Sequence, residues 1–465
     1  MINLITLPIN LKNHKVTVLG ARRSGLAAAQ LLAQRGAQVL LSDLAKIEIP
    51  ETVRQALHKH KVALELGQHS EKVTQSDLVV LSPGIPNTAP IVREIETKGI
   101  PIVSEIEMAY WLMPEAKLIA VTGSNGKTTT TTLIHELLKD TQYAVFCGGN
   151  IGISFSSLLP DADQVSHKPR VFVLEVSSFQ LERIIHFRPD IAVVLNVTDD
   201  HMDRYEHDIH QYLKAKLNIT RNQQEDDSFV YFADDALLKQ NLPPRPRKLP
   251  FGLTPNPAML FTADAQNIYT HARKILMHRA DIALLGEHNL LNILASLNAI
   301  SGLDIPTDQV RQVLRQFTGI EHRLEFVATI AEVAYYNDSK ATNVDSVKYA
   351  LKSFSQPVII ILGGRDKDSD FSQLLPYLQK NTKKAILIGE AATKIQQVIK
   401  KDIPHIFTKS MQDAVLQAHR LAQPGDVVLL SPACASFDMF ENFEHRGKVF
   451  KEIVHSLRQQ KVDEG

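Results

Sequence analysis

The chain has 465 residues, which is too long for one ordinary hydrophobic core, so we expect several domains. Lys plus Arg and Asp plus Glu each number 51, and the formal net charge is therefore zero. Because no global field attracts polyanions, the composition predicts no nucleic-acid partner. The apolar runs are far shorter than the ~20 residues that cross a bilayer, and residues 1–10 lack a signal-peptide pattern, so we expect no membrane insertion. Only two cysteines occur, Cys147 and Cys434, and this favours a reducing, cytoplasmic location.

Short β-branched runs alternate with helical patterns in the first hundred residues. Strands are predicted at residues 15–19, 38–42, 77–82 and 100–103, and a helix at 25–35. Strand, helix and strand in this order imply parallel pairing with right-handed crossovers. Residues 1–104 are therefore predicted to form an N-terminal Rossmann-like domain.

Two further α/β units follow along the chain. Nearly continuous apolar runs predict buried strands at 117–122, 171–176, 191–197, 358–362, 384–388 and 426–430. Residues 242–259 are rich in proline and polar residues and predict loops and peripheral strands. The fold class is thus α/β with three consecutive domains. We expect a central P-loop ATPase-like domain with a parallel sheet at 105–319 and a C-terminal Rossmann-like domain at 320–465.

A glycine loop between a strand and a helix is the strongest single signal. The predicted strand ends at Gly123, the chain turns through Gly126, and a helix opens at Lys127. Glycines let backbone N–H groups point at phosphate oxygens, and the helix N-terminus adds partial positive charge. Lys127 would neutralise the β- and γ-phosphates, and the Thr128 hydroxyl would contact Mg²⁺. The loop is shorter than the general P-loop pattern, and the alternative is a chance glycine turn before a helix.

A second glycine turn, Gly20 to Gly25, follows the first strand, and Asp43 ends the next strand 18 residues later. That spacing suits an acidic residue that receives a ribose hydroxyl or a base donor. The dinucleotide fingerprint is incomplete, because Ala21 and Arg22 stand where its second glycine would be. Nucleotide binding and a solvated turn both remain open here.

Polar groups follow the two buried strands of the central domain. Glu175 lies near the end of one strand, where a carboxylate is costly unless it meets a cation or strong donors. Residues 196–205 follow the next strand and include His201. Ligands of open α/β sheets bind outside the carboxyl ends of the strands, so both segments should face the phosphate loop.

Taken together, the motifs resemble those of the Mur ligase family, and most closely its D-glutamate-adding members. The resemblance covers nearly the whole chain. The stretches that carry it are 123–129, 148–152, 174–182, 196–205, 212–216, 286–289, 321–323, 337–343, 430–438 and 442–443.

The resemblance implies an amide-forming reaction. ATP would phosphorylate the carboxylate of UDP-N-acetylmuramoyl-L-alanine to an acyl phosphate, which the amine of D-glutamate would attack. It also implies two Mg²⁺ ions, carbamylation of Lys216, a monomer, and closure of the domains over ATP. The catalytic residues implied are Lys127, Glu175, His201 and Lys216. The metal residues implied are Thr128, Glu175, His201 and Lys216. Without the resemblance, Lys216 would be interpreted as an ordinary lysine on a helix surface.

The resemblance also implies a role for each domain: UDP-sugar binding for the first, ATP binding for the second and amino-acid binding for the third. The ATP-binding residues implied are Gly123, Ser124, Asn125, Gly126, Lys127, Thr128, Thr129, Asn289, Arg323 and Asp338. The UDP-sugar residues implied are Ser24, Asp43, Ser82, Gly84, Asn150 and His201. The amino-acid residues implied are Thr342, Lys367, Ser436 and Phe443, because a lysine and two hydroxyls suit two carboxylates. Leu44 and the pair Arg22 and Arg23 depart from the family pattern and bear on the uracil and diphosphate contacts.

Three alternatives are weighed against this interpretation. A folylpolyglutamate synthase or another Mur enzyme would share the chemistry but use a different acceptor. A binding module could retain only the phosphate loop, although such a module has no evident need for Glu175, His201 and Lys216 together. A dehydrogenase would explain the first glycine turn but would leave the phosphate loop unexplained.

Overall fold

The computed structural model describes residues 9–165, 167–202, 204–284 and 286–463. By its internal contacts the chain divides into two compact units, residues 1–279 with 292–311 and residues 280–291 with 312–465. The division falls within helices α10 (Glu287–Ile300) and α11 (Thr307–Gln316). Among the described helices, none combines the length and apolar character needed to cross a membrane.

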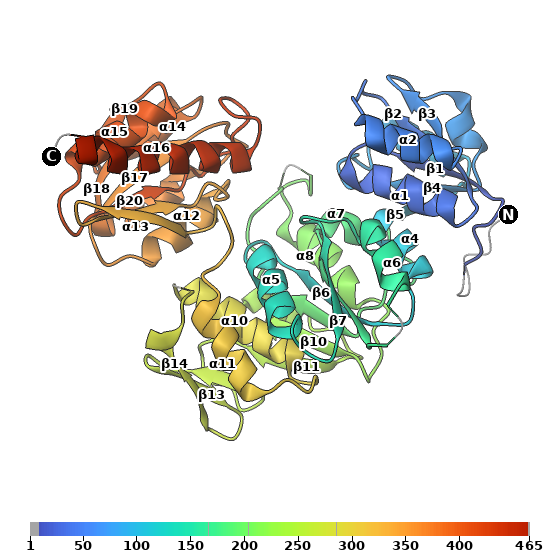
Figure 1. The fold of residues 1–465 in the computed structure, drawn as a ribbon, viewed down its shortest axis with the longest axis horizontal. Coiled ribbons are helices and arrows are strands. Elements are labelled where there is room, and N and C mark those ends of the chain that lie inside the picture. Colours follow the sequence, from blue (N-terminus) through green and yellow to red (C-terminus); the bar gives the residue numbers. More distant parts are fainter. Residues whose placement is uncertain (1–8, 166, 203, 285, 464–465) are drawn as a thin grey trace. The chain divides into compact units, whose positions relative to one another are not determined.

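The first unit opens with a five-stranded parallel sheet in the order β3-β2-β1-β4-β5 (Figure 1). Its strands are β1 (Lys15–Leu19), β2 (Gln38–Asp43), β3 (Ala63–Leu66), β4 (Leu78–Leu81) and β5 (Ile102–Ser104). The helices between and after them are α1 (Arg23–Gln34), α2 (Glu51–Lys59), α3 (Pro90–Thr97) and α4 (Glu105–Leu112), with a 3₁₀ turn at Glu71–Gln75. The predicted parallel, Rossmann-like sheet is confirmed, and β1 lies at its centre.

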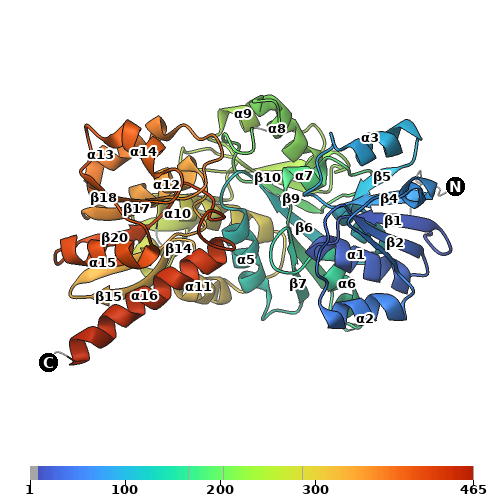
Figure 2. The ribbon, with the colours of Figure 1, turned by 90° about the horizontal axis from the view of Figure 1, so that it is seen from above.

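The same unit contains a six-stranded parallel sheet in the order β11-β10-β9-β6-β8-β7. Its strands are β6 (Lys117–Thr122), β7 (Ala144–Gly149), β8 (Arg170–Glu175), β9 (Ile191–Val194), β10 (Ser228–Phe232) and β11 (Arg247–Phe251). Its helices are α5 (Lys127–Leu138), α6 (Phe155–Asp163), α7 (Ser178–Leu181), α8 (Ile209–Leu217) and α9 (Ala236–Gln240). Helix α5 packs on β7 and β8, and Figure 2 shows it beside β6 and β7. Because β6 lies between β9 and β8, the loop from β6 to α5 opens from the middle of the sheet.

One hydrophobic cluster joins the two sheets of this unit. Leu32 of α1 and Ile106 of α4 belong to the same buried core as Phe155 of α6 and Phe172 of β8. Helix α6 packs against both α1 and α4. A small antiparallel sheet completes the unit, formed by β12 (Phe261–Ala263), β13 (Asn267–Thr270) and β14 (Ile275–His278).

The second unit contains a six-stranded sheet in the order β15-β16-β20-β17-β18-β19. Its strands are β15 (Glu325–Ile330), β16 (Val333–Asn337), β17 (Val358–Gly363), β18 (Thr382–Ile388), β19 (His405–Phe407) and β20 (Val427–Leu430). Its helices are α12 (Val344–Lys352), α13 (Leu375–Asn381), α14 (Ala392–Ile399), α15 (Met411–Leu421) and α16 (Phe443–Asp463). Only β15 pairs antiparallel within the described sheet. The expected parallel α/β sheet is present, with an antiparallel strand added at its edge.

Candidate active site

Two glycines shape the loop between β6 and α5. Gly123 has φ +152° and Gly126 has φ +86°, a left-handed conformation at the N-cap of α5. A Cβ atom on Gly123 would lie 3.0 Å from the Cβ of Leu195, and one on Gly126 would lie 2.3 Å from Oδ1 of Asn292. The loop therefore has the predicted strand, turn and helix form, and its positive φ angles and close neighbours favour glycine at both positions.

Asn196 holds this loop against the end of β9. Its Oδ1 accepts a hydrogen bond from the backbone N–H of Asn125 at 2.8 Å, and its Nδ2 donates to the carbonyl of Asn125 at 3.1 Å. The backbone N–H of Ser124 donates to the carbonyl of Asn196 at 2.9 Å. The sequence placed Asn196 only within a polar stretch, and this two-way clamp is a contact that the sequence analysis missed.

The Lys127 ammonium lies over the phosphate loop. Its Nζ donates to the carbonyls of Gly123 and Ser124, each at 2.8 Å. The positive charge therefore stands beside the left-handed turn and the N-terminus of α5. An anion bound at this place would meet both the ammonium and the positive end of the helix dipole.

Glu175 is buried at the end of β8, where it meets two donors. The Thr128 hydroxyl donates to Oε2 at 2.7 Å, and Nδ2 of Asn150 donates to Oε1 at 3.1 Å. Only 2% of Glu175 is exposed, so these bonds offset part of the cost of burying a carboxylate. Hydroxyl and carboxylate oxygens are the hard ligands that Mg²⁺ prefers, so this donor set suits that ion.

Lys216 lies inside the protein rather than on a helix surface. It belongs to α8, is 1% exposed, and its Nζ donates to the carbonyl of Gly123 at 2.9 Å. The same atom lies 4.1 Å from the ring centre of Tyr212. Burial lowers the pKa of Lys216 well below its ordinary value, and the charge of Lys127 lowers it further. The environment therefore favours the neutral amine.

His201 lies in the loop after β9 and is exposed, with φ +56°. Its ring centre is 5.0 Å from that of Phe179, in an edge-on arrangement, and its Nε2 is 3.8 Å from Oδ2 of Asp200. Phe179 belongs to α7, which follows Glu175, so the two predicted polar segments approach each other here. Asp203 of the same predicted stretch lies outside the described residues.

The N-terminal glycine turn is held by two of the residues predicted to bind the UDP-sugar. Asp43 accepts hydrogen bonds from the backbone N–H of Ala21 at 2.7 Å and of Ala45 at 2.9 Å. The Ser82 hydroxyl donates to the carbonyl of Gly20 at 3.3 Å, and a Cβ on Gly20 would lie 2.6 Å from that hydroxyl. Both side chains therefore fix the shape of the turn.

Other members of the predicted UDP-sugar set lie around the same sheet edge. Ser24 is half-buried in the first turn of α1, and Gly84 has open space where a Cβ would be. The Arg23 guanidinium donates to the carbonyl of Asn150 at 3.3 Å, which links the turn to the loop beside Glu175. Leu44, where the family pattern is broken, is 68% exposed.

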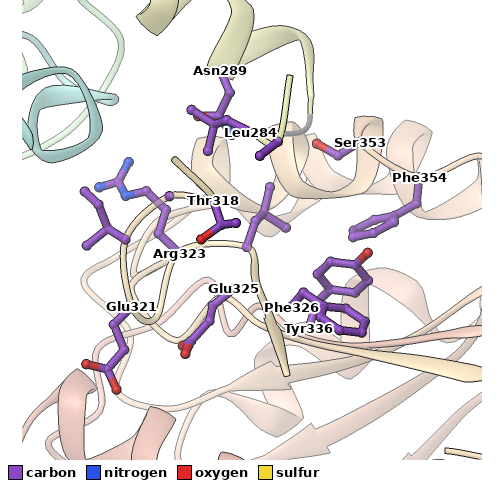
Figure 3. A pocket seen from close by; sticks show the side chains of 14 residues that line it. Leu284, Asn289, Thr318, Glu321, Arg323, Glu325, Phe326, Tyr336, Ser353 and Phe354 are labelled. Carbon is purple, nitrogen blue, oxygen red and sulfur yellow. The ribbon is translucent and has the colours of Figure 1, made fainter. Parts of the chain in front are cut away.

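A cavity of about 300 Å³ lies in the second unit (Figure 3). Asn289 and Arg323, two of the residues expected to hold the adenine nucleotide, line it. Its wall combines apolar side chains, among them Leu284, Phe326 and Phe354, with the carboxylates of Glu321 and Glu325. A cavity of this size that joins apolar walls to a few polar groups is typical of a small-molecule site.

Asp338, the third residue of that set, lies behind the cavity lining at the end of β16. It accepts hydrogen bonds from the Ser431 hydroxyl at 2.7 Å and from the backbone N–H of Leu324 at 3.1 Å. Burial raises the pKa of Asp338 to about 7, although the Ser431 hydrogen bond and the charge of Arg323 oppose the rise. Its charge therefore changes near neutral pH.

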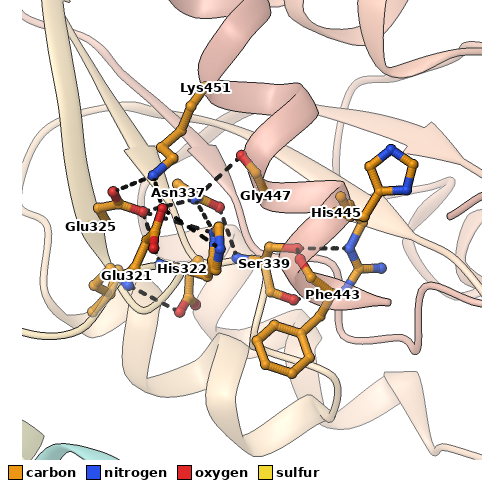
Figure 4. Close-up of polar contacts among 12 residues, drawn as sticks. Glu321, His322, Glu325, Asn337, Ser339, Phe443, His445, Gly447 and Lys451 are labelled. Carbon is orange, nitrogen blue, oxygen red and sulfur yellow. Dashed lines mark hydrogen bonds and ion pairs between the residues drawn. The ribbon is translucent and has the colours of Figure 1, made fainter. Parts of the chain in front are cut away.

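A polar cluster supports the loop that carries Arg323 (Figure 4). The Lys451 ammonium of α16 donates to Glu321, and to Oε1 of Glu325 at 2.9 Å. Nδ2 of Asn337 donates to Oε2 of Glu325 at 2.9 Å and lies 2.9 Å from Nδ1 of His322. Glu321, His322 and Glu325 have the proximity of metal ligands. Because Lys451 already supplies the positive charge, we assign no metal to this cluster.

The residues expected to bind the amino acid lie at or beyond the carboxyl ends of three adjacent strands, β16, β20 and β17. Thr342 follows β16, Ser436 follows β20, and the exposed Lys367 follows β17. Ser436 is buried, and Phe443 opens α16 with its ring centre 5.5 Å from the Nζ of Lys340. The structure thus groups these four positions on the side of the second unit's sheet where the carboxyl ends of these strands lie.

Comparison with known proteins decides the family. Three family models match in succession: the Mur ligase MurD-like N-terminal domain at residues 14–104, the Mur ligase middle domain at 121–300, and the Mur ligase glutamate ligase domain at 322–434. A UDP-N-acetylmuramoylalanine–D-glutamate ligase of Salinibacter ruber is 40% identical over 468 residues, which cover 97% of this chain and 99% of that protein. The chain belongs to the Mur ligase family.

Another relative and a solved structure agree with this result. A protein with the same name from Chlorobaculum parvum is 41% identical over 473 residues, covering 97% of this chain and 99% of its own. The crystal structure of a UDP-N-acetylmuramate-alanine ligase from Thermotoga maritima matches with a TM-score of 0.61 at 20% identity, over 96% of this chain and all of that one. The Mur ligase fold therefore extends over the whole chain.

Proposed function

We propose that this Mur ligase joins D-glutamate to the L-alanine carboxylate of UDP-N-acetylmuramoyl-L-alanine, with the conversion of ATP to ADP and phosphate, in peptidoglycan precursor synthesis. The observation that carries the proposal is the near-complete alignment at about 40% identity with ligases of that name. The match to the MurD-like N-terminal domain also favours this enzyme over a folylpolyglutamate synthase.

The reaction needs activation because a carboxylate is a poor electrophile. In the proposed sequence a carboxylate oxygen of the L-alanine attacks the γ-phosphorus of ATP, and ADP leaves. The amine of D-glutamate then attacks the acyl carbon, a proton is lost from the nitrogen, and phosphate leaves as the amide forms. Positioning and charge stabilisation are the main contributions that the protein makes to such a transfer.

The phosphate loop would bind the β- and γ-phosphates of ATP in this proposal. The N-terminus of α5 would supply backbone N–H donors, and Lys127 would supply the charge that stabilises the transferring phosphoryl group. Thr128 and Glu175 would hold a Mg²⁺ ion, and His201 would hold a second. These ions would act as Lewis acids that stabilise the negative charge on the phosphoryl oxygens.

Carbamylation of Lys216 is a separate part of the proposal. Carbon dioxide reacts with a neutral amine, and burial beside Lys127 favours that form of Lys216. The amine nitrogen adds to the carbon of CO₂ and loses a proton, so the neutral side chain becomes a carbamate anion. An anion beside the carbonyl of Gly123 would attract a cation to the phosphate loop. The contact that Lys216 already makes with this loop supports the assignment.

The remaining proposed roles are divided among three consecutive segments of the chain. We propose that residues 1–104 bind the UDP-sugar through Ser24, Asp43, Ser82 and Gly84, together with Asn150 and His201 of the next segment. Residues 105–319 would bind ATP, with Asn289 at the adenine, and residues 320–465 would contribute Arg323 and Asp338. Thr342, Lys367, Ser436 and Phe443 of the last segment would bind D-glutamate. We expect the enzyme to act as a monomer in the cytoplasm, where ATP is available.

A substrate panel tests the proposal. Phosphate release from ATP and Mg²⁺ is measured with UDP-N-acetylmuramoyl-L-alanine and a series of D- and L-amino acids. We expect release that requires both the nucleotide substrate and D-glutamate. Release with a different amino acid would support the ligase reaction but contradict D-glutamate as the amino-acid substrate. No release with any pair of substrates would contradict the ligase reaction itself.

A further inference from the structure

A buried arginine at the start of α16 carries an inference about the reaction site. Arg446 is 2% exposed, and among the described residues no carboxylate forms an ion pair with it. Burial lowers the pKa of Arg446 to about 10, so the side chain stays charged at neutral pH. A buried cation without a carboxylate is costly, and its hydrogen bonds show what offsets the cost.

All four of its hydrogen bonds reach two loops that follow adjacent strands. Nε donates to the Ser339 hydroxyl at 2.9 Å and Nη2 to the Ser339 carbonyl at 2.7 Å. Nη2 also donates to the carbonyl of Cys434 at 3.1 Å, and Nη1 donates to that of Ala435 at 3.3 Å. The guanidinium thus joins the loop after β16 to the loop after β20.

These two loops carry residues assigned to different substrates. Ser339 directly follows Asp338 of the adenine-nucleotide set and precedes Thr342 of the amino-acid set. Ala435 directly precedes Ser436 of the amino-acid set. The Ser339 hydroxyl also donates to the carbonyl of Phe443 at 2.8 Å (Figure 4). One side chain therefore contacts the immediate neighbours of residues in both sets.

A third loop is fixed to the same point. Ala435 and Arg365 exchange backbone hydrogen bonds at 2.8 and 2.9 Å, which ties the loop before Lys367 to the loop that Arg446 holds. Gly364 has φ +135°, and a Cβ there would lie 2.3 Å from the carbonyl oxygen of Ala435 and 3.1 Å from Nη1 of Arg446. The backbone of this loop therefore packs directly against the guanidinium.

We propose that Arg446 is a positioning residue that aligns the adenine-nucleotide loop with the amino-acid loop, so that the affinities for ATP and D-glutamate depend on the same side chain. The proposal rests on the proposed function, which assigns those loops to their substrates. A planar guanidinium with five donors can hold several acceptors at fixed angles, whereas a lysine ammonium acts as a single point of charge.

The test uses the full-length chain with Arg446→Lys, which keeps the charge and removes the planar fork. The KM values for ATP, D-glutamate and the UDP-sugar are measured together with kcat. We expect the KM for ATP and the KM for D-glutamate to rise together, each roughly tenfold or more, because charge-assisted hydrogen bonds to both loops are lost. The KM for the UDP-sugar should change less than about twofold.

A second variant keeps the test decisive if Arg446→Lys does not fold. Ser339→Ala removes the hydroxyl that accepts from Nε and donates to Phe443, and it should raise the same two KM values by a few fold. Lys448→Ala is the matched control, because Lys448 is an exposed residue of the same helix. It should leave all three KM values unchanged.

Two results would overturn the proposal. One is an Arg446→Lys or Ser339→Ala enzyme with a lower unfolding temperature but unchanged KM values for ATP and D-glutamate, as a purely structural role predicts. The other is a rise in only one of these KM values, either that for ATP or that for D-glutamate. The unmodified chain serves as the reference, since its failure to release phosphate with D-glutamate would contradict the proposed function instead.

Discussion

The Nζ atom of Lys216 lies 2.9 Å from the carbonyl oxygen of Gly123, although 93 positions separate the two residues in the chain. The contact places a buried amine directly under the phosphate loop, beside the carbonyl to which Lys127 also donates. Two lysines on one carbonyl repel each other as cations, and this repulsion contributes to the lowered pKa of Lys216.

Removal of the Lys216 amine should abolish the reaction and leave the fold intact. Lys216→Ala loses the amine that we propose to be carbamylated, and added acetate or formate should restore part of the rate by placing a carboxylate in the vacated space. Phosphate release with and without the additive measures the effect. Lys214→Ala, on the same helix, is the control. Full activity of Lys216→Ala without any additive would remove Lys216 from the mechanism.

The same lysine should limit stability. In CO₂-free buffer, between the lowered pKa of the folded state and the ordinary value of 10.5, the unfolded chain holds a proton on Lys216 that the folded chain lacks. The free energy of unfolding therefore rises with pH across this window. Lys216→Met should show a flatter pH dependence and, at neutral pH, an unfolding temperature a few degrees higher. If the unfolding temperatures of the unmodified protein and of Lys216→Met change by the same amount between pH 7 and 10, this account is wrong.

The Lys127 ammonium should be essential for phosphoryl transfer but not for folding. Lys127→Ala removes the charge beside the turn at Gly126, and we expect kcat to fall by at least roughly 10²-fold. Lys139→Ala, an exposed residue at the C-terminal end of the same helix, should retain normal turnover. Circular dichroism checks that both variants fold. Near-normal turnover of Lys127→Ala would contradict the assignment of the phosphate loop.

Most buried strands were predictable, because strands covered on both faces show as continuous apolar runs. Two edge strands were not: β3 and β15 have exposed or alternating side chains, and β15 pairs antiparallel. Strand β9 ends at Val194 rather than Val197. The residues beyond Val194 leave the sheet to grip the phosphate loop, as Asn196 does with Asn125.

Some residues of the candidate site were likewise predictable from the sequence, and others were not. Motif residues such as Lys127 and Glu175 were recognisable because their spacing places them at strand ends. The burial of Lys216 was not, because helix α8 gives no local sign of which face is covered. Arg446 was missed for a related reason. Its four acceptors are three backbone carbonyls and one serine hydroxyl, and such partners leave no pattern in the sequence.

Metal binding should depend on the pair Thr128 and Glu175. Thr128→Val removes the hydroxyl that donates to Glu175 and should raise the Mg²⁺ concentration needed for half-maximal activity by roughly tenfold or more. Thr128→Ser keeps the hydroxyl and should remain close to the unmodified enzyme. Mg²⁺ titrations at saturating ATP compare the three proteins. Identical titration curves for all of them would exclude Thr128 from the metal site.

Binding of ATP should weaken as the pH falls through about 7. Asp338 is half-protonated near that pH, and its carboxylate would accept a hydrogen bond from the bound nucleotide more strongly than the neutral acid would. The KM for ATP of the unmodified enzyme should therefore rise on acidification from pH 8 to pH 6. Asp338→Asn should have a higher KM that stays flat over this range. If Asp338→Asn retains the pH dependence of the KM for ATP, another titratable group causes it.

The most direct measurement follows an oxygen atom through the reaction. UDP-N-acetylmuramoyl-L-alanine with ¹⁸O in its carboxylate is incubated with ATP, Mg²⁺ and D-glutamate, and the phosphate and the nucleotide product are analysed by mass spectrometry. We predict one ¹⁸O atom in the phosphate for each amide formed, and a product heavier by one glutamyl residue. Unlabelled phosphate, or labelled phosphate without the D-glutamyl product, would contradict the proposed ligase.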